Sequence, residues 1–462
     1  MPLDFYRDVV GRSRNGPIMR ENDFEMNILA PKIREVQEKY KIKLDPNTPV
    51  PFDDSLADAV YQAALEFYAE VGTYCIDTNR VIKFTKDEIE EAVWASPREA
   101  QFGEGLDARI ISHRDVEDPR RPPLWITANA STVTQDRFFP IVQTFLQEPL
   151  CDLYNCPHVQ WIDGIELGGN DPTEYFGASR LAAMYDEARR RAGRPGIAVM
   201  NAGVAGPTAM GALAAARPGT GLTRREGWTG GPISEFKVDN HRLAKAAFFI
   251  DWNANRKWTV SPILGGYLGG PEGVAIGNVA YHMQGATLSK ITYCTSLPLH
   301  FVMSNNTHRM MLWAINVSHQ AIARNTPMIS FAQLVTRFGP GTETIAYEGA
   351  AWALGAMASG GNPSAIGFSG GGKANRVSPI DAKLVAEICL AVTGMSREEA
   401  NGLADSFIKM YEDKLSEPDL GYLYDDLYDP ETLKPRDETL ERYHRQKIEL
   451  EKLGIPFGRI KS

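Results

Sequence analysis

Short apolar runs alternate with amphipathic stretches from about residue 124 onward, and this alternation constrains the fold more than any other feature. The runs have the length and character of buried strands, and the stretches between them have the apolar spacing of helices. Strands that alternate with helices form a parallel sheet with crossover helices. The predicted strands are LWITANAS (124–131), LCDLYNCPHV (150–159), GIAVMNAG (196–203), WTVSPILGGY (258–267), ITYCTSLPLHFVMSNN (291–306), MISFAQLV (328–335) and SAIGFSGG (364–371).

The number and span of these units predict an α/β chain whose residues 121–415 form a (β/α)8 TIM barrel, with a doubly wound sheet as the alternative. Residues 1–120 are predicted to be an N-terminal helical extension, because an apolar stripe of helical period runs from Leu56 to Val71. Residues 416–462 are predicted to be a C-terminal helical tail that packs on the barrel or on a neighbouring subunit.

Several helix ends can be read from the sequence. Gly72 is a natural C-cap for the helix that carries the apolar stripe. Asp171-Pro172-Thr173-Glu174 supplies an N-cap, a proline at the first helical position and a carboxylate in the first turn. That helix should end at Gly193, and Ser378-Pro379 should begin another. A terminal helix is expected at about Glu438–Leu453.

Charge and composition exclude several classes of protein. The formal net charge is −9 and no stripe of Lys and Arg stands out, so nucleic-acid binding is not expected. No stretch has the roughly 20 apolar residues that a membrane-spanning helix needs. The first residues, MPLDFYRDVVGRSRNG, have no apolar signal core. Five cysteines, an odd number, fit a reducing compartment, so we expect a cytoplasmic protein.

A glycine-rich stretch, GFSGGGKAN at 367–375, resembles a phosphate-binding loop but departs from it. Ala374 stands where such a loop has the Ser or Thr that binds magnesium, and the next helix is expected to begin only at Ser378. We therefore interpret it as a loop after a late strand, in which glycines let the backbone approach a ligand. The candidate cofactor-binding residues here are Gly370, Gly371, Gly372 and Lys373, and an anion site is an open alternative.

The cysteines and histidines do not predict a metal site. Cys151, Cys156 and His158 lie close together, but their spacing is not one used for zinc. Buried structural cysteines are the favoured interpretation. His282, in the apolar stretch VAYHMQG, is predicted to be a hydrogen-bonded core residue.

In a barrel of this kind, catalytic residues come from the carboxyl ends of strands and the loops beyond them. Acidic residues near these ends are Glu235, Glu272, Glu343 and Glu348. Glu235 is expected to open a helix after the glycine-rich loop GWTGGPISEF, where a purely structural capping role is an equally good interpretation. The candidate catalytic residues are Glu235 and Glu343.

Stretches along almost the whole chain resemble the monomethylamine:corrinoid protein methyltransferases. They are YCIDTNRVIKFTKDEIEEAV from Tyr74, AGRPGIAV from Ala192, PILGGYLGG from Pro262, NTHR from Asn306, GPGTETIAYE from Gly339, ASGG from Ala358, AVTGMSREEAN from Ala391 and LEKLGIPF from Leu450. The resemblance implies a homo-oligomeric (β/α)8 barrel that moves a methyl group from a methylated amine to the Co(I) of a corrinoid. In this family a separate small protein carries the corrinoid, which fits the absence of a D-x-H-x-x-G signature from this sequence.

The sequence departs from the family at the residue that activates the amine. The family carries pyrrolysine just after the stretch that matches GRPGIAV, and this chain has Met200 or Ala205 there, neither of which is an electrophile. The family also has an acid three residues before the proline that matches Pro262, and here that residue is Thr259. A family acid after the glycine-rich loop is matched by Glu235.

Without the electrophile, a donor that is already activated is expected, such as a quaternary ammonium that leaves as a neutral amine. Such a cation suits an aromatic pocket. Trp252, Trp258, Tyr267 and Trp313 could line one, but core packing explains each equally well. The candidate substrate-binding residues are Met200, Asn201, Ala205, Thr259, Tyr267, Asn305 and Trp313.

Two other hypotheses stay open. One is a corrinoid-independent lyase or hydrolase that uses Glu235 and Glu343 as acid and base. The other is a non-catalytic protein that binds methylated amines.

Overall fold

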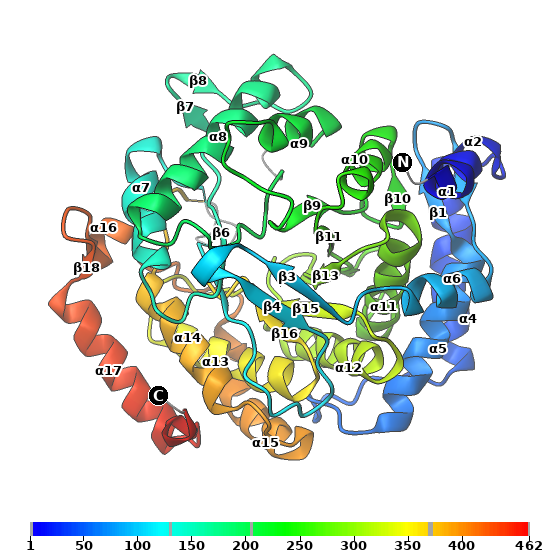
Figure 1. Cartoon of the computed structure of the whole chain (residues 1–462). Coiled ribbons are helices and arrows are strands. Elements are labelled where there is room, and N and C mark those ends of the chain that lie inside the picture. The colour runs from blue at the N-terminus through cyan, green and yellow to red at the C-terminus, as the bar shows by residue number, and fades with distance from the viewer. Residues whose placement is uncertain (1–2, 129–131, 204–206, 368–372, 461–462) are drawn as a thin grey trace.

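The computed structural model describes residues 3–128, 132–203, 207–367 and 373–460. Parallel strands lie at the centre and helices surround them (Figure 1). The central sheet has the order β16-β15-β13-β11-β9, with every neighbouring pair parallel. These strands are β9 (Trp228–Gly230), β11 (Arg256–Val260), β13 (Tyr293–Ser296), β15 (Ile329–Gln333) and β16 (Asn362–Ser364).

Two further strands extend the parallel pairing on both sides of this sheet. β5 (Trp125–Thr127) pairs with β6 (Leu153–Asn155). Isolated parallel bridges connect β5 to Ile366, β6 to Val199, and Ala202 to β9. The segment around Val199 therefore lies between β6 and β9, and the segment after β16 lies beside β5.

Helices between successive strands pack against the outer faces of those strands. Strand residues such as Ile126, Val260 and Ala332 meet the apolar sides of these helices in continuous cores. The helices are α7 (Gln135–Leu146), α8 (Pro172–Arg191), α9 (Ala209–Ala216), α10 (Asn240–Asp251), α11 (Pro271–Ser289), α12 (Arg309–Asn325), α13 (Thr344–Ala358) and α14 (Pro379–Ala391).

The N-terminal residues cover one side of this assembly. Helix α5 (Asp54–Val71) packs on α11 and α12, which explains why α11 is buried on every side. The other helical elements there are α1 (Leu3–Phe5), α2 (Gly11–Asn15), α3 (Glu21–Asp23), α4 (Ala30–Lys39) and α6 (Lys86–Trp94), with π-helical segments at Tyr6–Val10 and Phe24–Leu29.

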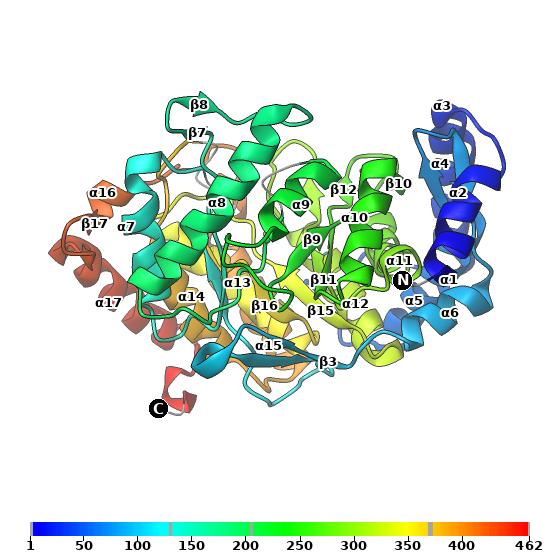
Figure 2. The same cartoon turned by 45° about the horizontal axis from the view of Figure 1, so that its top comes forward.

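The same N-terminal segment also contains strands that the sequence analysis did not predict. β1 (Thr73–Cys75) pairs with β2 (Arg80–Ile82) and runs parallel to β10 (Lys237–Val238). β3 (Glu99–Phe102) and β4 (Arg109–Ser112) form an antiparallel hairpin below the amino ends of the central strands (Figure 2). The segment is therefore mainly helical, but not wholly so.

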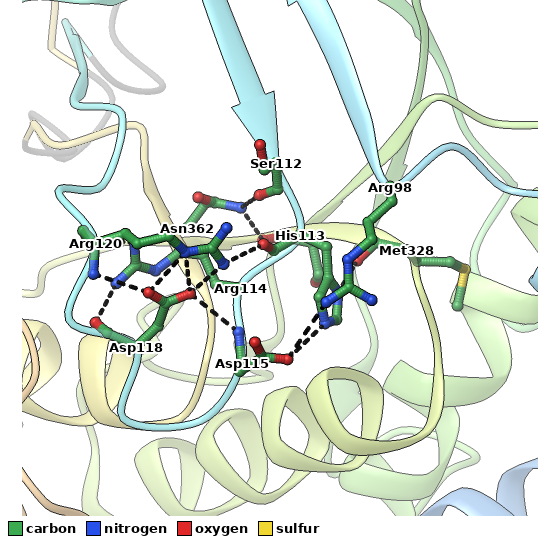
Figure 3. Close-up of polar contacts among 10 residues, drawn as sticks. Arg98, Ser112, His113, Arg114, Asp115, Asp118, Arg120, Met328 and Asn362 are labelled. Atoms are coloured by element: carbon green, nitrogen blue, oxygen red, sulfur yellow. Dashed lines mark hydrogen bonds and ion pairs between the residues drawn. The ribbon is translucent and has the colours of Figure 1, made fainter.

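The hairpin is held to the central strands by polar contacts that follow it in the chain (Figure 3). Asn362 of β16 donates to the Ser112 carbonyl at 3.2 Å, and a ring nitrogen of His113 lies 2.9 Å from the Met328 carbonyl oxygen. The Asp118 carboxylate accepts from the Arg120 backbone at 2.8 Å and closes the loop. Because these bonds hold the end of β4 and the segment after it against the central strands, the hairpin is a fixed part of the fold.

At the C-terminus, α15 (Arg397–Ile408) packs on α13, and α17 (Asp437–Lys452) packs on α13 and α14. Arg442 of α17 forms a buried ion pair with Asp381 of α14 at 2.9 Å. The remaining elements are α16 (Tyr424–Leu427), 3-10 turns at Gly105–Asp107, Glu412–Lys414 and Phe457–Arg459, and the pairs β7 (Trp161–Ile162) with β8 (Ile165–Glu166), β12 (Ile263–Leu264) with β14 (Leu299–His300), and β17 (Tyr428–Asp429) with β18 (Lys434–Pro435).

Most local predictions are confirmed. The Asp171 side chain caps α8, Ser378 caps α14, and Gly72 ends α5 with a positive φ of 71°. The terminal helix lies within one residue of its predicted ends. The sequence analysis missed β9, a strand of three residues that ends in Gly230 and is followed by Gly231 and Pro232. No helix among the described residues is long and apolar enough to cross a membrane.

Candidate active site at the carboxyl ends of the strands

The inward-facing side chains of the central strands form an apolar layer near the strand starts. Trp125, Tyr293 and Phe331 meet edge to face, with ring centroids 5.3 to 6.4 Å apart. Phe102 of the hairpin packs 5.2 Å from Tyr293 and closes this layer from below. The apolar layer consists of Phe102, Ile111, Trp125, Leu153, Ala198, Met200, Tyr293, Ile329 and Phe331.

Lys257 of β11 extends into this apolar layer without a carboxylate beside it. Its ammonium nitrogen lies 4.8 Å from the centroid of the Trp125 ring and 3.4 Å from the Met200 carbonyl oxygen, to which it donates. The Tyr293 hydroxyl donates to the same carbonyl at 3.4 Å. Burial lowers the pKa of Lys257 to about 7. The sequence analysis missed this residue, although a lysine inside a predicted buried strand is a usable signal.

The next inward-facing positions along the strands form a polar layer, because side chains two residues apart share a face. Trp125 and Thr127 share the inner face of β5, and Lys257 and Thr259 share that of β11. The hydroxyl oxygens of Thr229, Thr259 and Thr295 and the amide oxygen of Asn155 are buried without a hydrogen-bond partner among the described residues. The polar layer consists of Thr127, Asn155, Thr229, Thr259 and Thr295.

This polar layer contains hydroxyl and amide groups and no carboxylate. Asn155, Thr229 and Thr259 are partly exposed even though they lie on interior strands, so solvent reaches this level of the strands. Buried polar atoms without partners favour a polar ligand or water that completes their hydrogen bonds. The polar layer lies nearer the carboxyl ends of the strands than the apolar layer does.

The segment predicted to hold the activating residue lies against this interior. Met200 is fully buried within the apolar layer. Asn201 does not face a ligand, because its side chain accepts from the Cys156 backbone at 3.1 Å and donates to the Cys156 carbonyl at 2.9 Å. Ala205 lies outside the described residues. Among residues 197–203, no side chain is an electrophile.

A second feature of this end is a cavity of about 560 Å³, which we call the rim pocket. It is formed by loops that follow β9, β11 and β13. Its lining residues are Glu235, Ile263, Gly265, Gly266, Tyr267, Leu299, His300, Phe301 and Ser304.

Glu235 enters the rim pocket from a tight left-handed turn. The prediction that Glu235 opens a helix is wrong, since α10 begins only at Asn240. Glu235 and Phe236 have φ values of 65° and 58°, which side chains other than glycine rarely adopt. The Tyr281 hydroxyl accepts from both of their backbone N–H groups, at 2.9 and 3.1 Å, and the Tyr281 ring stacks on Phe236 with centroids 3.9 Å apart.

The Glu235 carboxyl is poorly satisfied for its depth. The residue is 8% exposed, and its Oε2 atom accepts no hydrogen bond from any described residue. Burial raises the pKa of this carboxyl to about 7. A carboxyl of this kind can donate or accept a proton near neutral pH, or it can neutralise a cation.

The other predicted site residues are dispersed. Tyr267 lines the rim pocket, whereas the buried Asn305 only braces its wall, by accepting from the His300 N–H at 3.0 Å. Trp313 lies in the core beneath the N-terminal helices. Glu343 is exposed and pairs with Arg445 of α17 at 3.0 Å, so it does not line the rim pocket with Glu235.

The remaining candidates lie away from the rim pocket. Lys373 is exposed, and the predicted late start of α14 at Pro379 is confirmed. Gly370, Gly371 and Gly372 lie outside the described residues. Trp258 is a core residue, and Trp252 packs on Trp228 and Phe248, so the expected aromatic set does not gather in one place.

The predictions that Cys151 and Cys156 are buried and that His282 is a hydrogen-bonded core residue agree with the structure. Cys151 and Cys156 are buried and not in disulfides. His282 is buried, and its ring nitrogens lie 2.8 Å from the Asn278 carbonyl and 2.8 Å from the Ser330 hydroxyl. No cluster of three or more metal-ligating side chains occurs in the part of the chain that the structure describes.

Comparison with known proteins gives one consistent result. The family model for monomethylamine methyltransferase MtmB matches residues 3–455. Monomethylamine methyltransferase MtmB2 of Methanosarcina acetivorans is 28% identical over 462 residues, covering 98% of each chain. Monomethylamine methyltransferase MtmB3 of Methanosarcina barkeri is 26% identical with the same coverage. The crystal structure of the M. barkeri monomethylamine methyltransferase superposes with a TM-score of 0.93 at 25% identity, covering 97% of this chain and 98% of that one.

Proposed function

Because the chain belongs to the monomethylamine methyltransferase MtmB family, we propose that it moves a methyl group from a methylated amine to the corrinoid of a separate protein. The donor that we propose is a quaternary or otherwise activated N-methyl compound and not monomethylamine. The observation that carries this choice is the lack of an electrophile at the position where the family carries its activating residue.

Three features of the interior support such a donor. Met200 is packed in the apolar layer and cannot form a covalent bond to an amine. Thr259, which replaces a family acid, contributes a neutral hydroxyl to the polar layer. No carboxylate belongs to that layer, so it offers no base for removing a proton from a primary ammonium.

The chemistry of a quaternary donor needs less from the protein. The carbon–nitrogen electron pair leaves with nitrogen, which becomes a neutral tertiary amine, and the Co(I) electron pair forms the new bond to carbon. No proton has to be supplied to the leaving group. The protein therefore needs mainly to orient the methyl group and exclude water.

We propose that the parallel pairings of the central strands complete a (β/α)8 barrel. The bridges of Ile126 to Ile366, Tyr154 to Val199 and Ala202 to Trp228 support this, since they link the ends of the central sheet through β5 and β6. The corrinoid protein would then approach the carboxyl ends, which is where barrel enzymes bind substrates. A homo-oligomeric, cytoplasmic enzyme is part of the same proposal.

The test is a methyl-transfer assay with the cognate corrinoid protein or free cobalamin reduced to Co(I). A panel of methylated amines is added, and loss of the Co(I) absorbance is followed. Loss with a quaternary ammonium and none with monomethylamine is the expected result. A response to monomethylamine would contradict the donor that we propose, and no response to any amine would favour a binding protein.

The alternative of a lyase or hydrolase that uses Glu235 and Glu343 together receives no support from the geometry, because Glu343 pairs with Arg445 outside the rim pocket. Glu235 alone keeps a proposed role. Glu235→Gln is expected to slow methyl transfer strongly, and unchanged kinetics would remove Glu235 from the reaction.

A further inference from the structure

We infer that the rim pocket is a binding site for an organic ammonium cation, with Glu235 as its counter-charge. This inference rests on the proposed function for its biological meaning, because the ligand would be the methylated donor or the amine that leaves. The binding itself is a property of the pocket, and it can be measured without methyl transfer.

The approach to the Glu235 carboxylate is kept open by glycine. A Cβ atom added at Gly266 would lie 3.1 Å from Glu235 Oε1, so a longer side chain there would cover the carboxylate. Gly265, at a φ of 90°, favours glycine for its backbone conformation as well. The carboxylate is thus buried from bulk solvent and still reachable from the cavity.

The charges around the pocket favour a cation. Lys237 lies 2.7 Å from Glu21 and 2.6 Å from Glu25, so its charge is already matched by two carboxylates. The Glu25 carboxylate raises the pKa of the nearby Tyr267 phenol, which stays neutral. Burial lowers the pKa of His300, and that of His308 behind it, so both rings are neutral at pH 7. The Lys237 charge also lowers the pKa of Glu235, but its ammonium is paired with Glu21 and Glu25 and forms no ion pair with Glu235.

The walls of the pocket select an organic cation over a metal ion. Ile263, Leu299 and Phe301 supply apolar surface, and Tyr267 supplies a second aromatic ring. A quaternary ammonium donates no hydrogen bonds and is held by charge, apolar contact and aromatic faces. A hard metal ion requires six or more oxygen ligands, and one carboxylate does not provide them.

Binding of a cation should be coupled to loss of a proton. In the empty pocket the carboxyl is about half protonated near pH 7. A cation stabilises the ionised form, so binding near pH 6.5 should release a proton. The affinity should rise as pH increases to about 7 and level off above it.

The experiment is isothermal titration calorimetry of the full chain with choline and with its neutral carbon isostere, 3,3-dimethyl-1-butanol. Each titration is run at pH 6.5 in two buffers of different ionisation enthalpy, which reports the protons released. Choline is expected to bind at least about tenfold more tightly than the isostere, with proton release. The Glu235→Gln variant should lose this preference and the proton release.

Two further variants distinguish a specific loss of the cation site from a general effect of substitution. Gly266→Leu keeps the carboxylate but covers it, and it should weaken choline binding. Glu104→Gln changes an exposed carboxylate beside the hairpin at the other end of the strands, and it should bind choline as the wild type does. Equal binding of choline and the isostere, or full choline affinity in Glu235→Gln, would overturn the inference.

The outcome is separable from that of the proposed function. Selective choline binding without methyl transfer from any amine would reject the methyltransferase proposal and keep the cation site. Methyl transfer that persists while choline shows no charge-dependent binding would reject the cation site and keep the methyltransferase proposal.

Discussion

Replacing Tyr281 with Phe should release the turn that carries Glu235. The substitution keeps the ring that stacks on Phe236 and removes only the hydroxyl that accepts from the Glu235 and Phe236 N–H groups. A buried donor left without a partner costs about 1–3 kcal/mol, so two donors cost about 2–6 kcal/mol. Two residues held at positive φ add about 2–4 kcal/mol of backbone strain that the hydroxyl now offsets.

The assay is hydrogen–deuterium exchange of peptides that span the turn. A local cost of at least 2 kcal/mol corresponds to about 30-fold faster exchange at residues 235 and 236, together with a lower Tm. Choline affinity should also fall, although Tyr281 does not line the rim pocket, because the carboxylate is no longer held in place. Tyr185→Phe is the control, since that hydroxyl makes one long bond to the Pro157 carbonyl, at 3.3 Å.

The result that would refute this reasoning is specific. Unchanged exchange at residues 235 and 236 in Tyr281→Phe would mean that the turn is stable without the hydroxyl. A Tm loss equal to that of Tyr185→Phe, with full choline affinity, would mean that Tyr281 contributes to packing alone.

Three other substitutions test the structure. Glu235→Gln should become more stable than the wild type as pH rises from about 4.5 to 7, because burial raises the pKa of the folded Glu235 carboxyl to about 7 and ionising it in the folded protein costs free energy. Tm measurements should show a gain of about 3 kcal/mol at pH 8 and little at pH 4. A stability difference that does not change with pH would contradict this. Glu226→Gln should cost about 1.5–3 kcal/mol by chemical denaturation, because it removes one of the two carboxylates that pair with the buried Arg189 and leaves only Asp186. Glu187→Gln in an exposed pair with Arg191 should change stability little. Gly339→Ala should lower Tm markedly, because the new Cβ would lie 1.8 Å from the Leu420 carbonyl oxygen; a Tm within a degree of the wild type would show that the loop at Leu420 moves freely.

The sequence was informative wherever structure depends on neighbouring residues. The caps of α8 and α14 were predicted because Asp171 and Ser378 each bond to a backbone N–H two or three residues further on. Most central strands were predicted because an apolar run in a buried parallel strand is a local pattern. β9 was missed because its three residues, Trp228, Thr229 and Gly230, give too little of that pattern.

The candidate site was less predictable, because its geometry depends on distant contacts. Glu235 was assigned to a helix start, which is usual for a glutamate after a glycine-rich loop. Its left-handed turn depends on Tyr281, which lies 46 residues away. Pairing Glu343 with Glu235 failed for a related reason, since Arg445 of the last helix binds Glu343.

The hairpin of β3 and β4 covers the amino ends of the central strands. In the proposed barrel, Phe102 and Ile111 cover the amino end, so we expect small molecules to enter and leave past the carboxyl ends. In the proposed reaction the corrinoid protein docks over those same carboxyl ends. The demethylated amine then leaves past the carboxyl ends as well. The corrinoid protein must therefore dissociate from this enzyme before the next donor molecule can enter.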